Sequence, residues 1–567
     1  MPLTRLTSRW GAALLGAALV LSGSVASSAT PDATPSQTPP PGVAASDGSP
    51  TNLVLAMPVV VPAGTTSLLS AEDLELYTSP TGVLTRQLDA VINRPVALGV
   101  DPRILASIRI LGTGAPESAV EWLDRLQGSS NETFSLAYAD ADVAALSQAG
   151  MTDLSVPTDF VIDPAVFPNE VQESPTASPS ASPSVSPSPS PTMPAEPAVP
   201  TGEDLVDLPF TLGPVVWPRD DTVVGADLEV FAALGDAVTV LDSSNASYPR
   251  DAIPASATAG GHRVLVSNND ISAFLRDAVS APTEAAWNSS MAQLTAALGG
   301  WTGGSATVLA TLDRSIPSSS NRIAATLTAL STTTGITLTT LSRTLAEDPA
   351  EIGIVDRAVP TERLTPLQSA LQTTPATTAF ASVLEDPSLI TGEQRRRMFA
   401  LASNAWVETS ADWQGAVEEF IAGAGELLSS VHVLDSSTIN LLSDTGDIPI
   451  TISNALPYPV TVNVQVWANR AVLDVLDDSV PVTIEAQSQA RAAVPVQSIA
   501  NGSAVLVVTL SSPTGVSIGA PLYVTTNVQA GWETAFTFVV AGIVLLVFVI
   551  GIIRTVARRR RERREAP

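Results

Sequence analysis

Aspartates at the ends of short apolar runs are the residues of this 567-residue chain best placed to do chemistry. Each follows, or closes, a run with the composition of a buried β-strand. In chain order they are Asp101 in GVDP, Asp140 and Asp142 in AYADAD, Asp220 and Asp221 in WPRDD, Asp242 in VLDSS, Asp270 in SNND and Asp313 in LDRS. Two carboxylates facing each other across a cleft would serve glycoside hydrolysis, one as acid and the other as nucleophile or base. Nearby, Tyr138 and Trp217 offer flat apolar faces for sugar rings.

The same aspartates also have a purely structural interpretation. Asp101 precedes Pro102 and Asp140 precedes a predicted helix, which are the positions of helix N-caps. Asp242 and Asp270 can be interpreted in the same way. Glycosidase acids are often glutamates, and no glutamate ends a predicted strand in this part of the chain. Capping is therefore the expected role of each aspartate taken singly, and the catalytic residues stay unassigned.

Several other chemistries are excluded by composition. The chain has no cysteine, which removes thiol nucleophiles, thiolate metal sites and disulfides. Its two histidines, His262 and His432, are far apart and form no His-x-x-x-His pair, so a zinc-dependent deacetylase is not expected. A Gly-x-Ser-x-Gly elbow and a glycine-rich phosphate loop are also missing. The sequence predicts no metal and no cofactor.

The elements that must position the aspartates alternate between strand and helix. Strands are predicted at 52–61, 96–100, 134–138, 214–217, 237–241, 263–266, 306–312 and 335–341. Helices are predicted after Ser79-Pro80 and at 140–149, 226–234, 271–279 and 321–330. This alternation predicts an α/β fold with a parallel sheet, resembling a distorted (β/α) barrel. The aspartates would then gather at the mouth, where the carboxyl ends of the strands meet.

The barrel-like head is divided by a Ser/Pro-rich segment. We expect one domain from residues 51–170 and 203–345, interrupted by a disordered insert over 171–202. Two smaller α/β domains are the alternative, because long structureless loops are uncommon inside a domain. A helical segment over 346–440 follows. From 447 to 528, the strict alternation in PVTVNVQVW and the spacing of later strands predict an immunoglobulin-like β-sandwich.

Both termini predict a membrane topology. Residues 1–29 have the basic, apolar and small-residue regions of a signal peptide, and a disordered leader follows over 30–50. Residues 532–553 form an apolar span, and 554–567 a basic tail. The tail arginines are Arg554, Arg558, Arg559, Arg560, Arg561, Arg563 and Arg564. Because arginines are retained on the cytoplasmic side, the chain is expected in the cell membrane as a single-pass protein with its bulk outside.

The charge of the chain argues against nucleic-acid binding. The formal net charge is −28. Without the leader's two arginines and the tail's seven arginines and two glutamates, the outer part holds 19 basic and 54 acidic residues, a net charge of −35. Such a field repels nucleic acids.

The order of these motifs carries a family resemblance. A signal peptide, GVDP, AYADADVAAL, VVWP, IPITISNALPYPVTVNVQV and a terminal span with an arginine-rich tail follow one another along most of the chain. This order resembles an uncharacterised family of actinobacterial cell-envelope proteins, usually encoded beside the lipid II flippase. The resemblance implies an association with cell-wall synthesis and transfers no functional residue.

Two functions are therefore expected, in this order. The first is a non-enzymatic, membrane-anchored envelope protein that binds a cell-wall glycan or a partner of the wall-synthesis machinery. The second is a glycoside hydrolase-like enzyme that uses paired aspartates at the barrel mouth. The separation of the carboxylates discriminates between them.

Overall fold

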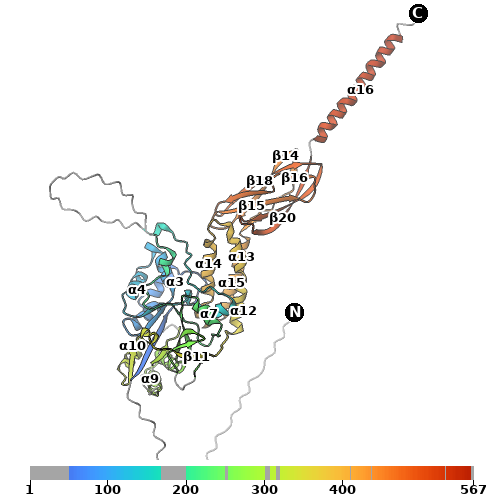
Figure 1. Cartoon of the computed structure of the whole chain (residues 1–567). Coiled ribbons are helices and arrows are strands. Elements are labelled where there is room, and N and C mark those ends of the chain that lie inside the picture. The colour runs from blue at the N-terminus through green and yellow to red at the C-terminus, as the bar shows by residue number, and fades with distance from the viewer. Residues whose placement is uncertain are drawn as a thin grey trace, which may run out of the picture. The chain divides into compact units, whose positions relative to one another are not determined.

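A computed structural model describes residues 50–167, 199–248, 253–300, 307–314, 320–408, 410–435, 437–529 and 532–562. The predicted signal peptide, the leader up to residue 49 and the Ser/Pro-rich insert over 168–198 lie outside the described residues. The described chain is a multidomain α/β protein with one apolar helix near its C-terminus (Figure 1).

The head is built on one curled half-barrel sheet. Its eight predicted strands are all confirmed: β1 (Thr51–Val59), β2 (Ala97–Val100), β3 (Thr133–Ser135), β4 (Val215–Val216), β5 (Val238–Asp242), β8 (His262–Ser267), β9 (Thr307–Thr311) and β10 (Ile336–Thr339). The order is β3-β2-β1-β9-β8, continues from β8 through β5 to β4, and places β10 beside β1. Every one of these pairings is parallel. Strands from both sides of the Ser/Pro-rich segment thus share one sheet, while closure into a complete barrel stays a prediction.

Three strands of this sheet are absent from the predicted set. β7 (Ser256–Ala259) turns back through Gly260 and Gly261, both with positive φ, to pair antiparallel with β8. β11 (Ala350–Ile354) lies parallel to β7 and antiparallel to β6 (Ala246–Ser247). The prediction of a helical segment from residue 346 is therefore wrong at its start. β6 and β7 contain no apolar residue larger than alanine, and β11 lies in the segment that was predicted to be helical.

Helices cover the sheet. They are α1 (Ala71–Thr78), α2 (Val83–Val91), α3 (Pro102–Ile110), α4 (Glu117–Gln127), α5 (Val143–Ala149), α6 (Gly202–Val206), α7 (Asp227–Ala232), α8 (Asn269–Ser280), α9 (Glu284–Gly299), α10 (Ser320–Thr332) and α11 (Leu341–Leu345). Five of them, α2, α5, α7, α8 and α10, lie where helices were predicted. In α2 the predicted apolar face of Val83, Leu84, Leu88 and Val91 is buried. Its predicted start at Ser79 is wrong, since Ser79 ends α1, whose capping box at Ser70 sets the earlier helix.

The helical region that follows consists of four helices packed on one another (Figure 1). They are α12 (Thr361–Leu371), α13 (Thr374–Phe380), α14 (Ser388–Leu401) and α15 (Ser410–Ser429). On α15, Trp413, Val417 and Phe420 are buried against the core of the head.

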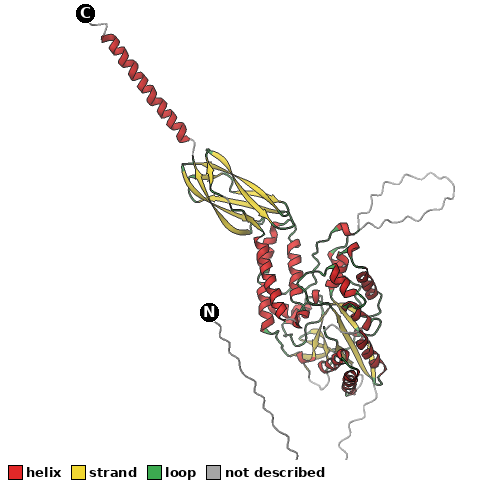
Figure 2. Ribbon diagram, turned by 180° about the vertical axis from the view of Figure 1, so that it is seen from behind, coloured by secondary structure: helices red, strands yellow, loops and turns green. Residues whose placement is uncertain are grey.

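Residues Val431 to Val528 form two β-sheets that share one hydrophobic core (Figure 2). The first sheet has the order β12 (Val431–Val433), β14 (Thr445–Asn454), β18 (Ser488–Ser498), β16 (Leu473–Val475). The second has the order β13 (Ile439–Leu441), β20 (Ser517–Val528), β19 (Gly502–Ser511), β15 (Val460–Ala468), β17 (Ser479–Ile484). In β15 the alternating valines are buried, as their period of two predicts. This two-sheet region starts before residue 447, and its immunoglobulin-like identity stays a prediction.

The last described element is the apolar helix α16 (Trp532–Glu562). Its stretch Phe536–Arg561 is long and apolar enough to cross a membrane, and its side chains are not buried inside the protein. The helix therefore agrees with the predicted span and supports membrane anchoring.

Candidate functional site

The carboxyl ends of the parallel strands open onto a cavity of about 850 Å3, which we call the mouth cavity. Its lining comes from Val61–Ala63 after β1, Trp217 and Arg219–Asp221 after β4, Leu312–Arg314 after β9, Arg276 of α8, and Asn404–Val407 with Asp412 from the helical region. Ligands of parallel α/β sheets bind at this end of the strands. The mouth cavity is therefore the candidate functional site.

Arg314 connects the ends of three strands across this cavity. It follows β9, and its Nε donates to both carboxylate oxygens of Asp140, at 2.9 and 2.7 Å. One terminal nitrogen donates to the carbonyl oxygen of Trp217 at 2.7 Å. The guanidinium carbon lies 5.2 Å from the centroid of the Trp217 ring, within the range of a cation–π contact. One side chain thus joins the segments that follow β3, β4 and β9.

A second arginine engages Asp220. From α8, Arg276 donates a hydrogen bond to the Asp220 carboxylate at 2.9 Å and another to the Thr311 hydroxyl at 2.9 Å. Its Nε donates to the carbonyl oxygen of Thr311 at 3.1 Å. Asp140 and Asp220 are both candidate acids of the hydrolase hypothesis. Each of them therefore forms an ion pair with an arginine.

Asp140 is held in an unusual backbone conformation. Ala139 and Asp140 have φ values of 58° and 47°, in the left-handed region that non-glycine residues seldom adopt. The turn is held because Asp101 accepts from the Ala139 amide at 2.7 Å and Asn404 Nδ2 donates to the Asp140 carbonyl at 2.9 Å. Burial raises the pKa of Asp140, while the positive charge of Arg314 opposes that rise. The predicted N-cap role of Asp140 is wrong, because this turn delays the start of α5 to Val143.

Three other predicted aspartates cap backbone amides, as the structural interpretation expects. Asp101 accepts from the Arg103 amide at 2.9 Å at the start of α3. Asp142 caps α5 through the Ala145 amide at 3.1 Å. Asp242 accepts from the Ser244 amide at 2.8 Å. Burial raises the pKa of Asp101 to about 7 and also raises the pKa of Asp242.

The remaining predicted aspartates are more exposed. Asp221 and Asp313 line the mouth cavity. Asp221 has a φ of 60°, accepts from the Ser244 hydroxyl, and lies 4.0 Å from the Arg357 guanidinium. Asp270 lies on the first turn of α8, whose N-cap is Asn268, so the predicted capping role of Asp270 is wrong.

The two predicted aromatic faces differ in their placement. Tyr138 is fully buried, and its hydroxyl donates to the carbonyl oxygen of Ser67 at 2.6 Å, so it has no face to offer a sugar. Burial raises its pKa. Trp217 does line the mouth cavity, although only 5% of its surface is exposed. Both residues were predicted as the last residues of strands, but β3 ends at Ser135 and β4 at Val216, so each lies beyond its strand.

Three residues that sequence reasoning missed complete the cavity. Trp406 adds a second indole ring to the lining. Asn404 is buried, and its amide nitrogen donates to the Asp140 carbonyl oxygen. Its Oδ1 has no hydrogen-bond partner among the described residues. Arg219 is half-buried and forms no ion pair with any residue in the described part of the chain. Arg219 and Arg314 stood beside predicted aspartates in WPRDD and LDRS, whereas Asn404 and Trp406 had no such signal.

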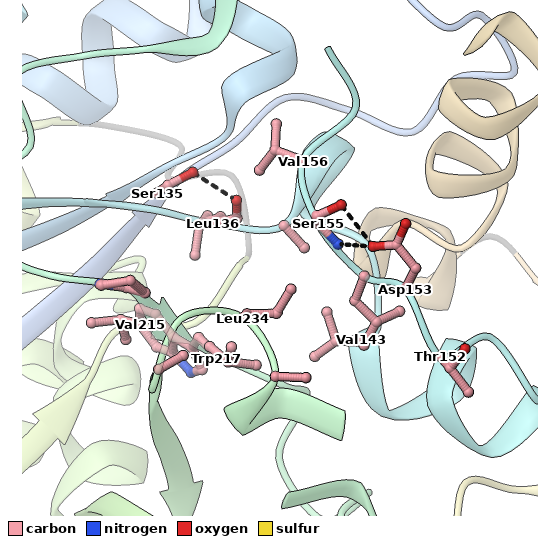
Figure 3. A pocket seen from close by; sticks show the side chains of 16 residues that line it. Ser135, Leu136, Val143, Thr152, Asp153, Ser155, Val156, Val215, Trp217 and Leu234 are labelled. Atoms are coloured by element: carbon pink, nitrogen blue, oxygen red, sulfur yellow. Dashed lines mark hydrogen bonds between the residues drawn. The ribbon is translucent and has the colours of Figure 1, made fainter. Parts of the chain in front are cut away.

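A second pocket of about 500 Å3 lies where the half-barrel is open (Figure 3). It separates Ser135–Ala137 at the end of β3 from Pro214–Trp217 at β4, and Thr152–Val156 and Leu234 complete it. Trp217 lines both this pocket and the mouth cavity. In Figure 3 the Asp153 carboxylate accepts from the Ser155 amide and hydroxyl. A hydrogen bond from Arg395, aided by Ser155, lowers the pKa of Asp153 to about 2.

The comparisons place the chain in a family. A family model described as "Family of unknown function (DUF6049)" matches residues 2–567, and thus both the head and the two-sheet region. The chain belongs to this family. The match confirms an uncharacterised family over the whole chain, while the actinobacterial origin and the gene neighbourhood stay predictions. No curated protein matches the sequence.

Solved structures are similar to only a small part of this DUF6049 member. Native alpha-2-macroglobulin from E. coli is 19% identical, with 18% of this chain and 7% of that chain covered and a TM-score of 0.16. WR4, an MSP family member from C. elegans, is 12% identical over 18% of this chain and 99% of its own, with a TM-score of 0.14. The E. coli chaperone DraB is 15% identical over 18% and 55%, with a TM-score of 0.14. At these TM-scores the similarities carry no argument about function.

Replacing Asp101 by Asn is expected to flatten the pH dependence of stability. The pKa of Asp101 is about 7 in the folded protein and 3.8 otherwise, so between these values the folded state keeps a proton that the unfolded chain has released. Stability therefore falls as the pH rises through this window, by up to roughly 4 kcal/mol. Asn caps α3 without titrating. Urea unfolding of the full chain in detergent, followed by tryptophan fluorescence from pH 4 to pH 7, measures the slope.

The matched control for this experiment is Asp153→Asn. The pKa of Asp153 is lowered to about 2, so its contribution is lost only as the pH falls below 4. This variant should keep the wild-type slope between pH 4 and pH 7. An unchanged slope in Asp101→Asn would contradict the burial of an ionisable carboxyl at this position.

A double-mutant cycle on Arg314 and Asp140 is expected to show strong coupling. Both side chains are largely buried, so Arg314→Met or Asp140→Asn alone leaves an unpaired buried charge or polar group and should cost about 3 kcal/mol of unfolding free energy. The double variant should cost well below the sum. Arg125→Met with Asp89→Asn is the control, since that pair is exposed and should couple by less than about 1 kcal/mol. Equal coupling in the two cycles would refute the role given to Arg314.

Proposed function

We propose that this DUF6049 member is a membrane-anchored envelope protein whose mouth cavity binds a cell-wall glycan without cleaving it. The observation that carries the proposal is the lining of the mouth cavity by Trp217, Trp406 and Asn404, whose buried Oδ1 has no hydrogen-bond partner in the described structure. A buried acceptor left unpaired costs about 1–3 kcal/mol, which a sugar hydroxyl would recover by donating to it. Arg219 would donate to further oxygens of the same ligand.

Binding is better supported than hydrolysis by the state of the carboxylates. A glycosidase needs one carboxyl that gives up a proton and another that is free to attack or to activate water. Asp140 and Asp220 are ion-paired with Arg314 and Arg276, and Asp101, Asp142 and Asp242 accept from backbone amides. These contacts give each of the five a structural role. Aspartates that are already engaged in this way support binding over hydrolysis.

The cellular setting of the proposal comes from the C-terminal helix and the residues that follow it. α16 supports membrane anchoring, and the seven arginines after residue 553 favour a cytoplasmic C-terminus with the head on the outer side. The resemblance to cell-envelope proteins makes wall glycans the first ligands to test. The alternative ligand, a partner protein of the wall-synthesis machinery, is suggested by that resemblance alone. No contact of the described residues supports it.

Removing the unpaired guanidinium in the mouth cavity is expected to weaken glycan binding. Hydrogen bonds to charged groups contribute about 1.5–3 kcal/mol, so Arg219→Ala should lower the affinity for the wall ligand about tenfold or more. The full chain in nanodiscs would be incubated with insoluble peptidoglycan and with arabinogalactan, and the bound fraction measured. Arg491→Ala is the matched control, because Arg491 is an exposed arginine of β18 outside the mouth cavity.

Two results would overturn the proposal. One is wild-type protein that binds neither polymer. The other is the release of reducing ends from either polymer by wild-type protein, abolished by Asp140→Asn or Asp220→Asn, which would assign hydrolysis instead.

The proposed orientation is tested separately with alkaline phosphatase, which folds to an active enzyme only outside the cytoplasm. Fused after Pro567, the reporter should be inactive; inserted after Ser182 in the Ser/Pro-rich segment, it should be active. The reverse pattern of activities would show that the head faces the cytoplasm.

A further inference from the structure

Two aromatic side chains lie in one row on the outer face of the five-stranded sheet. In the strand register Trp467 of β15 is opposite Val507 of β19, and Val507 is opposite Tyr523 of β20. Residues that are opposite in neighbouring strands project from the same face of a sheet. Trp467 is 49% exposed and Tyr523 67% exposed, while the residues next to them in sequence on β15, Val466, and on β20, Val524, are buried in the core. The row therefore faces solvent.

The strands that carry this row contain no charged residue, although the exposed Asp477 and Asp478 lie beside Trp467 where the chain enters β17. None of the strands β13, β15, β17, β19 and β20 contains an acidic or basic residue, although the chain has 56 acidic residues. Every strand of the other sheet carries a charged or titratable residue: His432, Asp447, Asp474 and Arg491. Charged side chains on exposed surfaces help to keep proteins soluble and apart. Their absence from the strands of only one sheet marks the outer face of that sheet as a contact surface.

The polar groups on this face are hydroxyls and amides. Exposed or half-buried positions beside the aromatic row are occupied by Asn463, Gln465, Thr509 and Thr525. Such side chains both donate and accept hydrogen bonds without the desolvation cost of a charge, and they match sugar hydroxyls. A protein-binding surface has instead a large apolar or aromatic centre. Here a single half-buried valine separates the two rings.

The spacing of the rings also fits a sugar chain. Neighbouring strands are 4.7–4.9 Å apart, so Trp467 and Tyr523, two strands apart, are separated by roughly 10 Å across the sheet. This is close to the length of a disaccharide unit, so a linear glycan crossing the strands can stack one sugar on each ring. Because the strands of this face have no charged side chain to pair with a charged ligand, an uncharged ligand fits it better.

We propose that the outer face of the β13-β20-β19-β15-β17 sheet is a second glycan-binding surface, in which Trp467 and Tyr523 stack on alternate sugars of a neutral linear polysaccharide. The surface does not depend on the mouth cavity, since it shares no residue with it. It would give the protein a contact with the wall even where the mouth cavity is empty.

The test titrates full-length protein in nanodiscs with soluble chitin oligosaccharides, which are neutral and linear, by isothermal calorimetry. Trp467→Ala and Tyr523→Ala should each weaken binding about five- to tenfold, as expected for the loss of one stacked ring. Tyr523→Phe, which keeps the ring, should bind like wild type. Leu476→Ala is the control for removing an exposed apolar side chain outside this sheet, and it should change nothing.

Further outcomes separate this surface from the mouth cavity and from self-association. Arg219→Ala should leave binding to the chitin oligosaccharides unchanged; if it abolishes that binding, the oligosaccharide occupies the mouth cavity and the second surface is refuted. If wild type does not bind, or if Trp467→Ala binds normally, the proposal fails. A decrease in particle mass by light scattering in Trp467→Ala, with binding unchanged, would assign the face to contacts between two copies of the chain.

Discussion

The half-barrel of this protein is joined across its open side by side chains and not by strand pairing. Between β3 and β4 the described chain has backbone hydrogen bonds only from Thr211 and Leu212 to Thr133. Beyond that point Phe134 packs on Trp217, with ring centroids 6.2 Å apart, and Arg314 reaches both Asp140 and the Trp217 carbonyl. These contacts hold the segments that line the mouth cavity. The shape of the cavity therefore depends on the Arg314 guanidinium. The left-handed turn at Ala139 and Asp140 presents the carboxylate to that guanidinium.

The same arrangement explains why so many aspartates collect at this end of the sheet. Parallel strands bring the amino ends of the following helices to one edge, and unpaired amides there attract carboxylates. Asp101 and Asp142 meet this need, and Asp140 and Asp220 balance two arginines that the cavity would otherwise bury unpaired. The acidic mouth is thus a consequence of the architecture, and the groups left unsatisfied, Asn404 and Arg219, are the informative ones.

Much of the fold follows from local patterns that the sequence displays. The eight predicted strands of the head are present because each belongs to an apolar run, and β15 was predicted because its valines alternate. The short strands β6, β7 and β11 were missed because pairing, not composition, makes them strands. Proximity to strand ends placed Trp217, Asp220, Asp221 and Asp313 at the mouth cavity, while their roles in binding or catalysis stay predictions. It could not identify Asn404 or Trp406, because these residues reach the mouth cavity by tertiary packing of the helical region. It also could not predict that the Tyr138 side chain is buried.

The length of α16 has a mechanical consequence. Its 31 residues span roughly 46 Å at 1.5 Å per residue, well beyond the roughly 30 Å of bilayer hydrocarbon. The part of α16 that exceeds this thickness continues the same helix and includes Arg554 and Arg558–Arg561. In a bilayer, sliding this helix toward the opposite leaflet would drag guanidinium groups into lipid, at about 2.5–3.5 kcal/mol each. In a membrane the arginines would therefore limit how far the helix can move along its axis.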